Sequence, residues 1–332
     1  MQLRPATPTD KSAIIDLLKK SLGESRIPKS ELLWNWKHEQ NPFGASYVLL
    51  AEESNKLIGL RAFMQWQWRW NSKIYKAIRA VDTATDPDHQ GKGIFKKLTL
   101  HQIGICKQEG VHFVFNTPNE KSKPGYLKMG WVEQGKLPLK FKILRPVSLI
   151  YSKLFKKDIS QDVEDDAPPL QPWGSDIINL IPDEWKKNDR LSSNLSRQYI
   201  SWRYGKNPLF RYDYFTDHSN FLLISRIKKH SFAQELRIVE FILLKPATDS
   251  KKLNNEMGNQ VLKFCTSNNI DFISMSGLQY SLNKSCFQWM GFLPVRALGP
   301  SITLKDINMN EQFKDLLPIN NWAYSLGDLE LF

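Results

Sequence analysis

The residues best suited to chemistry follow the strand-like run Ile74–Thr85. Gln90, Gly91, Lys92 and Gly93 form a turn with two glycines, and a helical pattern begins directly after it. Glycine has no Cβ atom, so an anion can approach the backbone of such a turn closely. The first amides of a helix have no partner within the helix and lie at its positive end. The segment therefore predicts a binding site for a phosphate or pyrophosphate group.

The spacing of these residues separates the turn from other nucleotide sites. It is not the GxxxxGK[ST] of a P-loop, so hydrolysis of ATP or GTP is not expected, and it is not the GxGxxG of a dinucleotide site. The three cysteines, Cys106, Cys265 and Cys286, form no CxxC pair, and neither HExxH nor GxSxG occurs. The sequence therefore predicts no bound metal and no serine-hydrolase triad.

Two segments resemble the GNAT superfamily of N-acetyltransferases. Residues 90–94 of the turn match the Q/R-x-x-G-x-G/A signature of that family. The turn departs from the signature at Phe95, where the family has a small residue. Further along the chain, a second segment resembles the closing pattern N-x₆-Y-x-K-x-G-F, with Trp in place of Phe. It consists of Asn119, Tyr126, Lys128, Gly130 and Trp131. The resemblance covers residues 1–145 and implies an α/β fold with a mixed, mostly antiparallel sheet flanked by helices.

The resemblance also implies a cofactor and roles for these residues. Acetyl-CoA is the expected acyl donor, with its pyrophosphate at the turn and its pantetheine arm held by Asn119. Tyr126 is expected to be the general acid that protonates the departing thiolate, with ordinary packing of a half-buried aromatic ring as the alternative. The expected contacts to coenzyme A are Ala84, Thr85, Gln90, Gly91, Lys92, Gly93, Ile94, Phe95 and Asn119.

Asp82 is the candidate for a general base. An amine must lose a proton before it attacks a thioester, and a carboxylate or an ordered water can accept that proton. Asp82 lies on the strand-like run that stops at Pro87. An aspartate with an ordinary pKa near 3.9 is a weak base, so Asp82 would need burial to raise its pKa, or it would act through water. An aspartate at the surface of the strand, or an ion-paired one, is the alternative.

Helical and strand-like patterns alternate around these residues. Ile14, Leu17 and Leu18 follow Asp10 at helical spacing and predict a first helix. The runs that follow are Ser46–Ala51, Leu57–Trp70 and Ile74–Thr85 as strands, Ile94–Gln108 as a helix, Val111–Phe115 as a strand and Glu120–Met129 as a helix. This order predicts a mixed α/β layer fold.

The pattern repeats in the second half of the chain. Trp36 precedes Asn41-Pro42 at the same spacing at which Trp202 precedes Asn207-Pro208. Such a correspondence over half the length of the chain predicts an internal duplication. The segment KKLNNE at 251–256, where a second phosphate turn would fall, has no glycine. The second copy is therefore not expected to bind coenzyme A.

A length of 332 residues is typical of two domains. Residues 156–172 combine acidic residues with three prolines and have no hydrophobic period, as linkers do. The predicted division is a GNAT domain with the acetyl-CoA site at 1–150, a linker at 151–172 and a degenerate GNAT-like domain at 173–332. The last of these is expected to support the first domain and to shape the acceptor pocket.

The chain has a net charge of +12, which favours an anionic partner such as a nucleotide cofactor or reflects a lysine-rich composition alone. No nucleic-acid-binding motif is recognised and no apolar run could span a membrane, so neither nucleic acid nor membrane insertion is expected. The basic amphipathic stretch 149–157 is expected to be a short helix or linker, with contact to a membrane surface as the alternative. The few cysteines and the lack of an apolar signal core predict a cytoplasmic protein.

These observations predict an N-acyltransferase that moves an acetyl group from acetyl-CoA to the primary amine of a small acceptor, such as an amino sugar. Two alternatives stay open. One is an aminoacyl or peptidyl transferase of the tandem GNAT type that uses aminoacyl-tRNA, and the other is a non-catalytic module that binds coenzyme A. The chain end carries Asp328, Glu330 and the carboxylate of Phe332, which either hold the acceptor amine or belong to a frayed tail.

Overall fold

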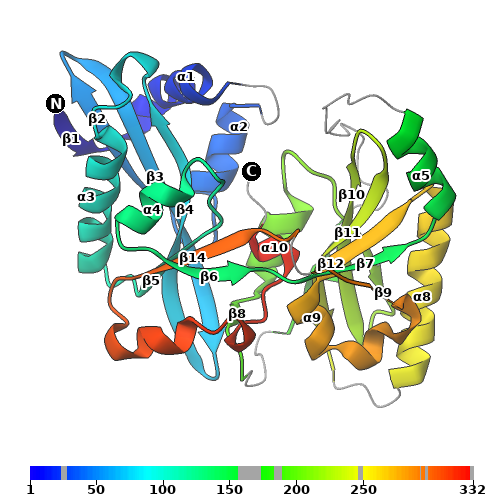
Figure 1. Ribbon diagram of the computed structural model, residues 1–332. Coiled ribbons are helices and arrows are strands. Elements are labelled where there is room, and N and C mark those ends of the chain that lie inside the picture. Colours follow the sequence, from blue (N-terminus) through cyan, green and yellow to red (C-terminus); the bar gives the residue numbers. More distant parts are fainter. Residues whose placement is uncertain are drawn as a thin grey trace.

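The computed structural model describes residues 1–23, 28–155, 173–182, 189–245, 250–291, 293–295 and 298–329. Two β-sheets lie side by side with helices packed against each of them, and the short helix α10 (Leu326–Leu329) lies between the sheets (Figure 1). Both sheets contain parallel and antiparallel pairs of strands, which confirms the predicted α/β class with mixed sheets. Of the predicted linker 151–172, residues 151–155 belong to a helix, and the rest lies outside the described residues.

The first sheet has eight strands in the order β1-β2-β3-β4-β5-β14-β6, with β8 paired to β3. The strands are β1 (Gln2–Pro5), β2 (Tyr47–Glu53), β3 (Lys56–Trp70), β4 (Lys73–Thr85), β5 (Phe113–Asn116), β14 (Ser301–Asp306), β6 (Val132–Lys136) and β8 (Ser192–Ser193). The two long strands, β3 and β4, match the strand-like runs expected from the sequence. Each has a run of consecutive buried residues in its middle, which reflects a sheet that is packed on both faces.

The second sheet has six strands in the order β13-β7-β12-β11-β10-β9. The strands are β13 (Leu293–Val295), β7 (Leu139–Ile143), β12 (Phe272–Ser276), β11 (Gln234–Leu243), β10 (Phe221–Lys229) and β9 (Asp213–Thr216).

The helices join and cover these strands. The α-helices are α1 (Lys11–Leu22), α2 (Glu31–Trp34), α3 (Ile94–Gln108), α4 (Lys123–Lys128), α5 (Pro146–Phe155), α6 (Ser175–Asn179), α7 (Arg197–Ile200), α8 (Ser250–Ser267), α9 (Gly277–Leu282) and α10. The π and 3₁₀ helices are η1 (Pro8–Asp10), η2 (Asn35–Glu39), η3 (Pro87–His89), η4 (Ser201–Gly205), η5 (Lys284–Met290), η6 (Asn310–Leu316) and η7 (Ile319–Asn321). The helix predicted at Ile94–Gln108 is confirmed, whereas the one predicted at Glu120–Met129 is shorter, as α4.

The two sheets share one pattern of pairing. In the first sheet β4 runs parallel to β5, and β14 is antiparallel to both β5 and β6. In the second sheet β11 runs parallel to β12, and β7 is antiparallel to both β12 and β13. A long helix, α3 or α8, makes the crossover between the parallel strands in each case, as parallel pairing requires.

Each half of the chain gives a central strand to the sheet of the other half, and the second half also gives the short strand β8 to the first sheet. β7 comes directly after β6 in sequence but lies in the second sheet, and β14 comes from the end of the chain but lies in the first sheet (Figure 1). β14 is inserted between β5 and β6, and β7 is inserted between β12 and β13. The sheets therefore cross the predicted boundary near residue 150, and neither half of the chain contains a complete sheet.

The repeated Trp and Asn residues adopt the same local structure in both halves. Trp36 and Trp202 each lie in a π-helix, and their rings stack with centroids 4.8 Å apart. The indole N–H of Trp36 donates to the carbonyl oxygen of Trp202 at 2.9 Å, and the indole of Trp202 donates to the carbonyl of Trp36 at 2.8 Å. Asn41 and Asn207 both accept a hydrogen bond from the backbone two residues later. The two halves thus meet through reciprocal contacts of equivalent residues.

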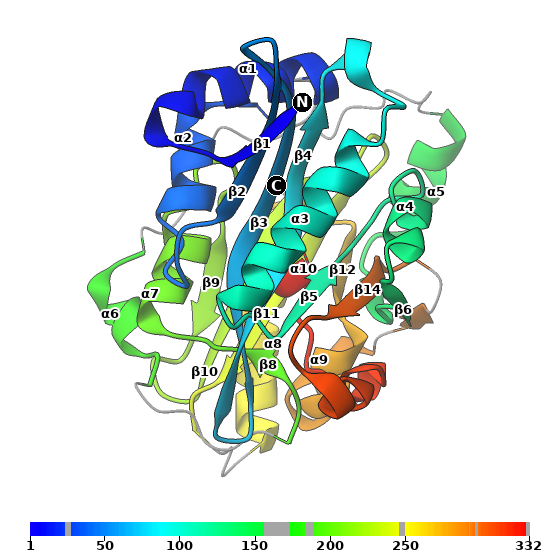
Figure 2. The same cartoon turned by 90° about the vertical axis from the view of Figure 1, so that its left-hand side faces the viewer.

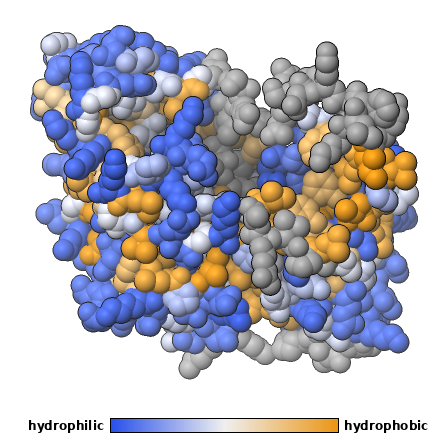
Figure 3. Space-filling model, viewed as in Figure 1, coloured by the Kyte–Doolittle hydropathy of each residue, from blue (hydrophilic) through white to orange (hydrophobic). Residues whose placement is uncertain are grey.

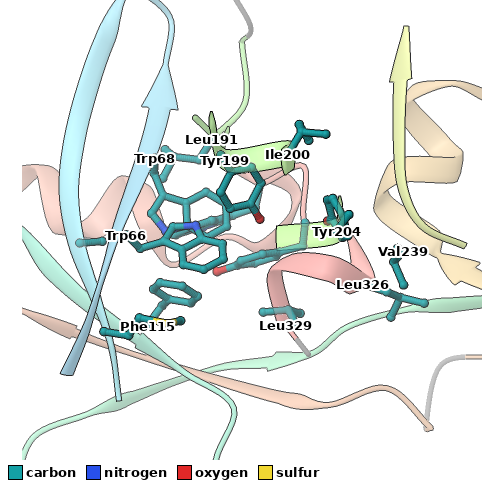
Figure 4. Packing of buried hydrophobic residues seen from close by; sticks show 14 of the residues in the cluster. Trp66, Trp68, Phe115, Leu191, Tyr199, Ile200, Tyr204, Val239, Leu326 and Leu329 are labelled. Atoms are coloured by element: carbon teal, nitrogen blue, oxygen red, sulfur yellow. The ribbon is translucent and has the colours of Figure 1, made fainter. Parts of the chain in front are cut away.

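A single large core joins the two sheets. Figure 4 shows aromatic residues of β3, β5 and α7 packed beside aliphatic residues of β11 and α10. Trp66, Trp68 and Tyr199 are almost completely buried within it. Burial of such rings is among the largest favourable terms in folding. The core therefore fixes the position of one sheet relative to the other.

Helix α3 lies close against the first sheet, across the face seen in Figure 2. A Cβ atom at Gly59 of β3 would lie 2.7 Å from Cγ2 of Ile94, so only glycine permits this approach. Ile94 and Leu98 are buried against the sheet. This packing places the first turn of α3, and the glycines before it, at the end of β4.

Hydrophobic residues are exposed around α5. Val147 is 79% exposed and Ile150 is 61% exposed, and Ile143 at the end of β7 is 47% exposed. Figure 3 shows hydrophobic surface gathered on this side of the second sheet. The helix predicted within the basic stretch 149–157 is thus present up to Phe155. None of the helices in the described residues is long and apolar enough to cross a membrane.

Candidate active site

A large pocket opens where β4 and β5 separate. These parallel strands pair only from Ala77 with Phe113 to Arg79 with Phe115, and beyond that point the pocket lies between them. Its volume is about 820 Å³. It is lined by Leu22, residues 80–83, Thr85, residues 89–91, residues 93–96, residues 116–119, Lys121, Ser122, Gly125 and Tyr126. The pocket joins both segments that the sequence singled out, because the glycine turn and Tyr126 both contribute to its wall.

The glycine turn forms the wall of the pocket that lies at the start of α3. Gly91 has φ +78° and Gly93 has φ +75°, which L side chains rarely adopt, and a Cβ at either position would meet only open space. Gly93 is the N-cap of α3, a helix of 15 residues. The unpaired amides of its first turn and the positive end of the helix dipole suit an anion here. The local backbone therefore has the form expected of a phosphate site.

Most of the predicted contacts to coenzyme A line this pocket. They are Thr85, Gln90, Gly91, Gly93, Ile94, Phe95 and Asn119. Ala84 does not, because its side chain is buried on the other side of β4 in a cluster with Ile14 and Leu18 of α1. Lys92 is exposed on the outside of the turn, so it adds positive charge nearby without lining the pocket.

Phe95 has a structural reason to depart from the family signature. Its ring lies over Gly125 of α4, where a Cβ atom would be 3.2 Å from Cε1 of Phe95. The same ring meets Tyr126 edge-on, with centroids 5.5 Å apart. The larger side chain at position 95 thus fills the space that a glycine at position 125 leaves, and it holds α4 against α3.

Tyr126 reaches the pocket from α4 and is 5% exposed. Its hydroxyl oxygen accepts a hydrogen bond of 2.9 Å from Nη1 of Arg61 on β3. A guanidinium only donates, so the phenolic proton must point away from Arg61. That proton is available to a group in the pocket.

Asp82 is ion-paired and only partly exposed, and ion pairing is one of the alternatives that the sequence left open. Its carboxylate is 2.8 Å from Nζ of Lys37 and 2.7 Å from Nε2 of His38, both on η2. Burial raises the pKa of Asp82, but Lys37 and His38 outweigh it and hold this pKa well below the ordinary value. This is the reverse of the raised pKa that a direct base needs.

His38 completes a buried chain of polar groups. Burial lowers its pKa, so its ring is neutral near pH 7. Because the ionised Asp82 can only accept, Nε2 of His38 donates to it, and Nδ1 accepts from the hydroxyl of Ser46 at 2.9 Å. The chain fixes the orientation of the Asp82 carboxylate at the edge of the pocket.

Sequence reasoning missed several residues of this site. Asn116, at the end of β5, lines the pocket and is 3% exposed, and its Nδ2 has no hydrogen-bond partner among the described residues. Arg61 is a charged residue within an apolar run, and Arg61, Lys37 and His38 are each almost completely buried. Buried charges of this kind are uncommon and need a partner. The apolar run around Arg61 is the feature of the sequence that could have indicated its burial.

The chain end is ordered as far as Leu329. Asp328 is 1% exposed, and its carboxylate accepts from the Ser193 hydroxyl at 2.5 Å and from the Ser325 amide at 2.8 Å. Arg79 of β4 donates to the carbonyl oxygens of Asp328 and Leu329, both at 2.6 Å. Asp328 is therefore not part of a frayed tail, while Glu330 and Phe332 lie outside the described residues.

The geometry can be compared with known proteins. Residues 2–133 match the family model of the acetyltransferase (GNAT) domain. The match includes the glycine turn, Asn119 and Tyr126, and it ends before β7. A GNAT domain supports acyl transfer as the general class of reaction. No curated protein matches the chain.

Solved structures share the fold over almost the whole chain. A conserved protein of unknown function from Enterococcus faecalis, described as a probable N-acyltransferase, is similar with a TM-score of 0.61 and 11% identity, over 93% of this chain and 73% of that one. A GCN5-related N-acetyltransferase from Anabaena variabilis is similar with a TM-score of 0.58 and 11% identity, over 93% and 74% of the two chains. At this identity the likeness concerns the fold.

Proposed function

We propose that this protein is an N-acyltransferase that moves an acetyl group from acetyl-CoA to the primary amine of a small acceptor, such as an amino sugar. The observation that carries the proposal is the pocket between β4 and β5. It has an anion-binding turn at Gly91 and Gly93, a hydroxyl donor at Tyr126 and enough volume for an extended cofactor arm.

Residues at different places along the pocket are proposed to bind different parts of acetyl-CoA. The amides at the start of α3 bind the pyrophosphate, and Lys96 beside them adds positive charge. Asn119 and Asn116 supply polar contacts for the pantetheine arm and the acyl group, respectively. The thioester then lies near Tyr126, whose proton points away from Arg61.

The proposed reaction needs three proton transfers, two from the acceptor nitrogen and one to the sulfur. The anionic Asp82 attracts the ammonium form of the acceptor to the edge of the pocket. The ammonium gives one proton to water before it attacks, because the lowered pKa of Asp82 makes that carboxylate a poor direct base. After attack on the carbonyl carbon, the nitrogen gives a second proton to water, the C–S bond breaks and Tyr126 gives its proton to the sulfur.

The second half of the chain is proposed to be a degenerate GNAT-like domain. The repeated strand pairing supports this, and so does the position of 251–256 within helix α8 rather than in a glycine turn. Of the alternatives, a tandem transferase that uses aminoacyl-tRNA has no need of the phosphate turn. The glycine conformation in the first half therefore favours coenzyme A.

Acetyl transfer from radiolabelled acetyl-CoA to a panel of amines tests the proposal. The panel contains amino sugars, polyamines, amino acids and a lysine peptide, and coenzyme A binding is measured by calorimetry on the same preparation. We expect binding and the transfer of label to a small amine. Binding without transfer to any amine would indicate a non-catalytic module, and no binding would contradict the assignment of the pocket.

A further inference from the structure

Arg61 is a fully buried cation without a counter-ion. It lies on β3 opposite Thr83 of β4, and it forms no ion pair with any residue that the structure describes. Nη1 donates to the hydroxyls of Tyr126 and Thr83. Nε and Nη2 have no hydrogen-bond partner in the described ranges. A buried charge left in this state is costly, because water no longer solvates it.

The surroundings of Arg61 stabilise its charge only in part. The guanidinium lies 4.4 Å from the ring centre of Phe63, 5.5 Å from that of Tyr126 and 5.8 Å from that of Phe95. Cation–π contacts of this kind are weaker than a carboxylate partner. Arg79, which is equally buried on the neighbouring strand β4, donates instead to two backbone carbonyls. Nη2 of Arg79 also lies 3.4 Å from the hydroxyl of Thr117 in the pocket, whereas Arg61 donates to the Tyr126 hydroxyl, the proposed proton donor.

We propose that Arg61 is a positioning residue for the proposed acyl transfer, which orients Tyr126 and stabilises the anion that forms when Tyr126 gives up its proton. As the tetrahedral intermediate collapses, the C–S bond breaks and its electron pair goes to sulfur. The proton of the Tyr126 hydroxyl moves to that sulfur, which leaves as the thiol of coenzyme A. The phenolate of Tyr126 then faces the guanidinium of Arg61 until solvent returns a proton.

This assignment rests on the proposed function and follows from two physical points. A hydrogen bond from a charged donor to the oxygen favours the ionised form of that oxygen. It also fixes the direction of the phenolic proton toward the pocket, because Arg61 occupies a lone pair of the same oxygen. The cost of burying Arg61 without a counter-ion is then offset at the step in which negative charge appears beside it.

The test compares Arg61→Met, Arg61→Lys and the double variant Arg61→Met/Tyr126→Phe, with Arg69→Met on the same strand as the matched control. We expect Arg61→Met to lower kcat by about 10-fold to 100-fold with little change in KM for acetyl-CoA. Arg61→Lys should recover part of the loss. In the Tyr126→Phe background the same change should have less than about a 3-fold further effect, since Arg61 acts through Tyr126. Arg69→Met should be close to wild type.

Stability separates this role from a structural one. A cation without a counter-ion can be replaced by an apolar side chain at little cost, so the melting temperature of Arg61→Met should hold or rise. Loss of the fold in both Arg61→Met and Arg61→Lys would show a structural residue and would overturn the proposal. So would an equal fall in kcat with and without Tyr126.

A binding measurement tests Arg61 even if no acceptor is found. The affinity of the full chain for coenzyme A is compared with that for desulfo-coenzyme A at pH 7 and pH 9.5, a range in which ordinary thiols ionise. We expect the affinity ratio to rise with pH in the wild type, because a thiolate is favoured near Arg61, and not in Arg61→Met. The same rise in both proteins would contradict the proposal, whereas binding without acetyl transfer would contradict the proposed function alone.

Discussion

The two sheets open in the same way but into different pockets. In the first sheet β4 and β5 part after Arg79, and Asp82 lies three residues beyond that point. In the second sheet β11 and β12 part after Arg237, and Glu240 lies three residues beyond that point. The second opening has a pocket of about 310 Å³, lined in part by Glu240 and Asp328.

The charges in the two pockets are of opposite kinds. The first has glycines at a helix N-terminus with Lys96 beside them, and its Asp82 is paired with Lys37. In the second, burial and the charge of Asp328 raise the pKa of Glu240 to about 8. An acidic pocket repels the phosphates of coenzyme A. One backbone arrangement thus offers the proposed cofactor site in one half and an acidic pocket beside α10 in the other.

Separating the two halves, and with them the exchanged strands, is expected to have the largest effect. It tests whether either half folds independently. Fragments 1–155 and 173–332 each lack the central strand that the other supplies, β14 or β7. We expect neither fragment to unfold cooperatively alone, because a strand missing from the middle of a sheet leaves its neighbours without partners. Mixing the fragments should restore cooperative melting and coenzyme A binding. A folded fragment 1–155 that binds coenzyme A would contradict this expectation.

The proposed catalytic difference between the halves centres on Tyr126. We expect Tyr126→Phe to lower kcat by about 10²-fold to 10⁴-fold, the range for loss of a general acid, with little change in affinity for acetyl-CoA. Tyr47→Phe is the matched control, because Tyr47 packs against the same core cluster but does not line the pocket. Steady-state kinetics with the best acceptor of the panel measures both. Unchanged turnover in Tyr126→Phe would show that this ring only packs.

Much of the first pocket could be predicted from the sequence because its signals are local. The glycine turn, the helix after it and the position of Tyr126 are encoded within short segments, and the structure has the helix at Ile94–Gln108 as predicted. The strand exchange could not be predicted, since nothing local to β7 or β14 marks their partners, which lie far away in sequence. The pairing of Arg61 with Tyr126 and of Asp82 with Lys37 depends on the same long-range packing.

The ion-paired state of Asp82 predicts an effect on stability. Asp82→Asn removes the negative charge that pairs with the buried Lys37, so it should destabilise the protein by about 3–5 kcal/mol. Lys37→Met in the same chain should recover most of that loss. Because the pKa of Asp82 is lowered, protonation of Asp82 should not reduce kcat/KM of the wild type at any pH above about 5. An unchanged melting temperature with a shifted pH profile would make Asp82 the direct base.

The acidic pocket predicts a smaller, pH-dependent effect. The pKa of Glu240 in the folded protein, about 8, lies above that of an unfolded glutamate. The folded state therefore holds an extra proton between these values, and its stability falls as pH rises through about 8. We expect the melting temperature to fall more between pH 6 and pH 9 in the wild type than in Glu240→Gln. Parallel curves for the two proteins would contradict the raised pKa of Glu240.

Calorimetric titration of the full chain with coenzyme A tests most directly whether the first pocket alone is the cofactor site. Gly93→Asp adds a side chain and a negative charge at the turn, while Gly110→Asp adds the same group at the other end of α3, at a glycine of similar φ in equally open space. We predict one coenzyme A per chain, near wild-type affinity in Gly110→Asp and a loss of about 100-fold or more in Gly93→Asp. Equal affinities in the two variants, or two bound molecules per chain, would contradict the account.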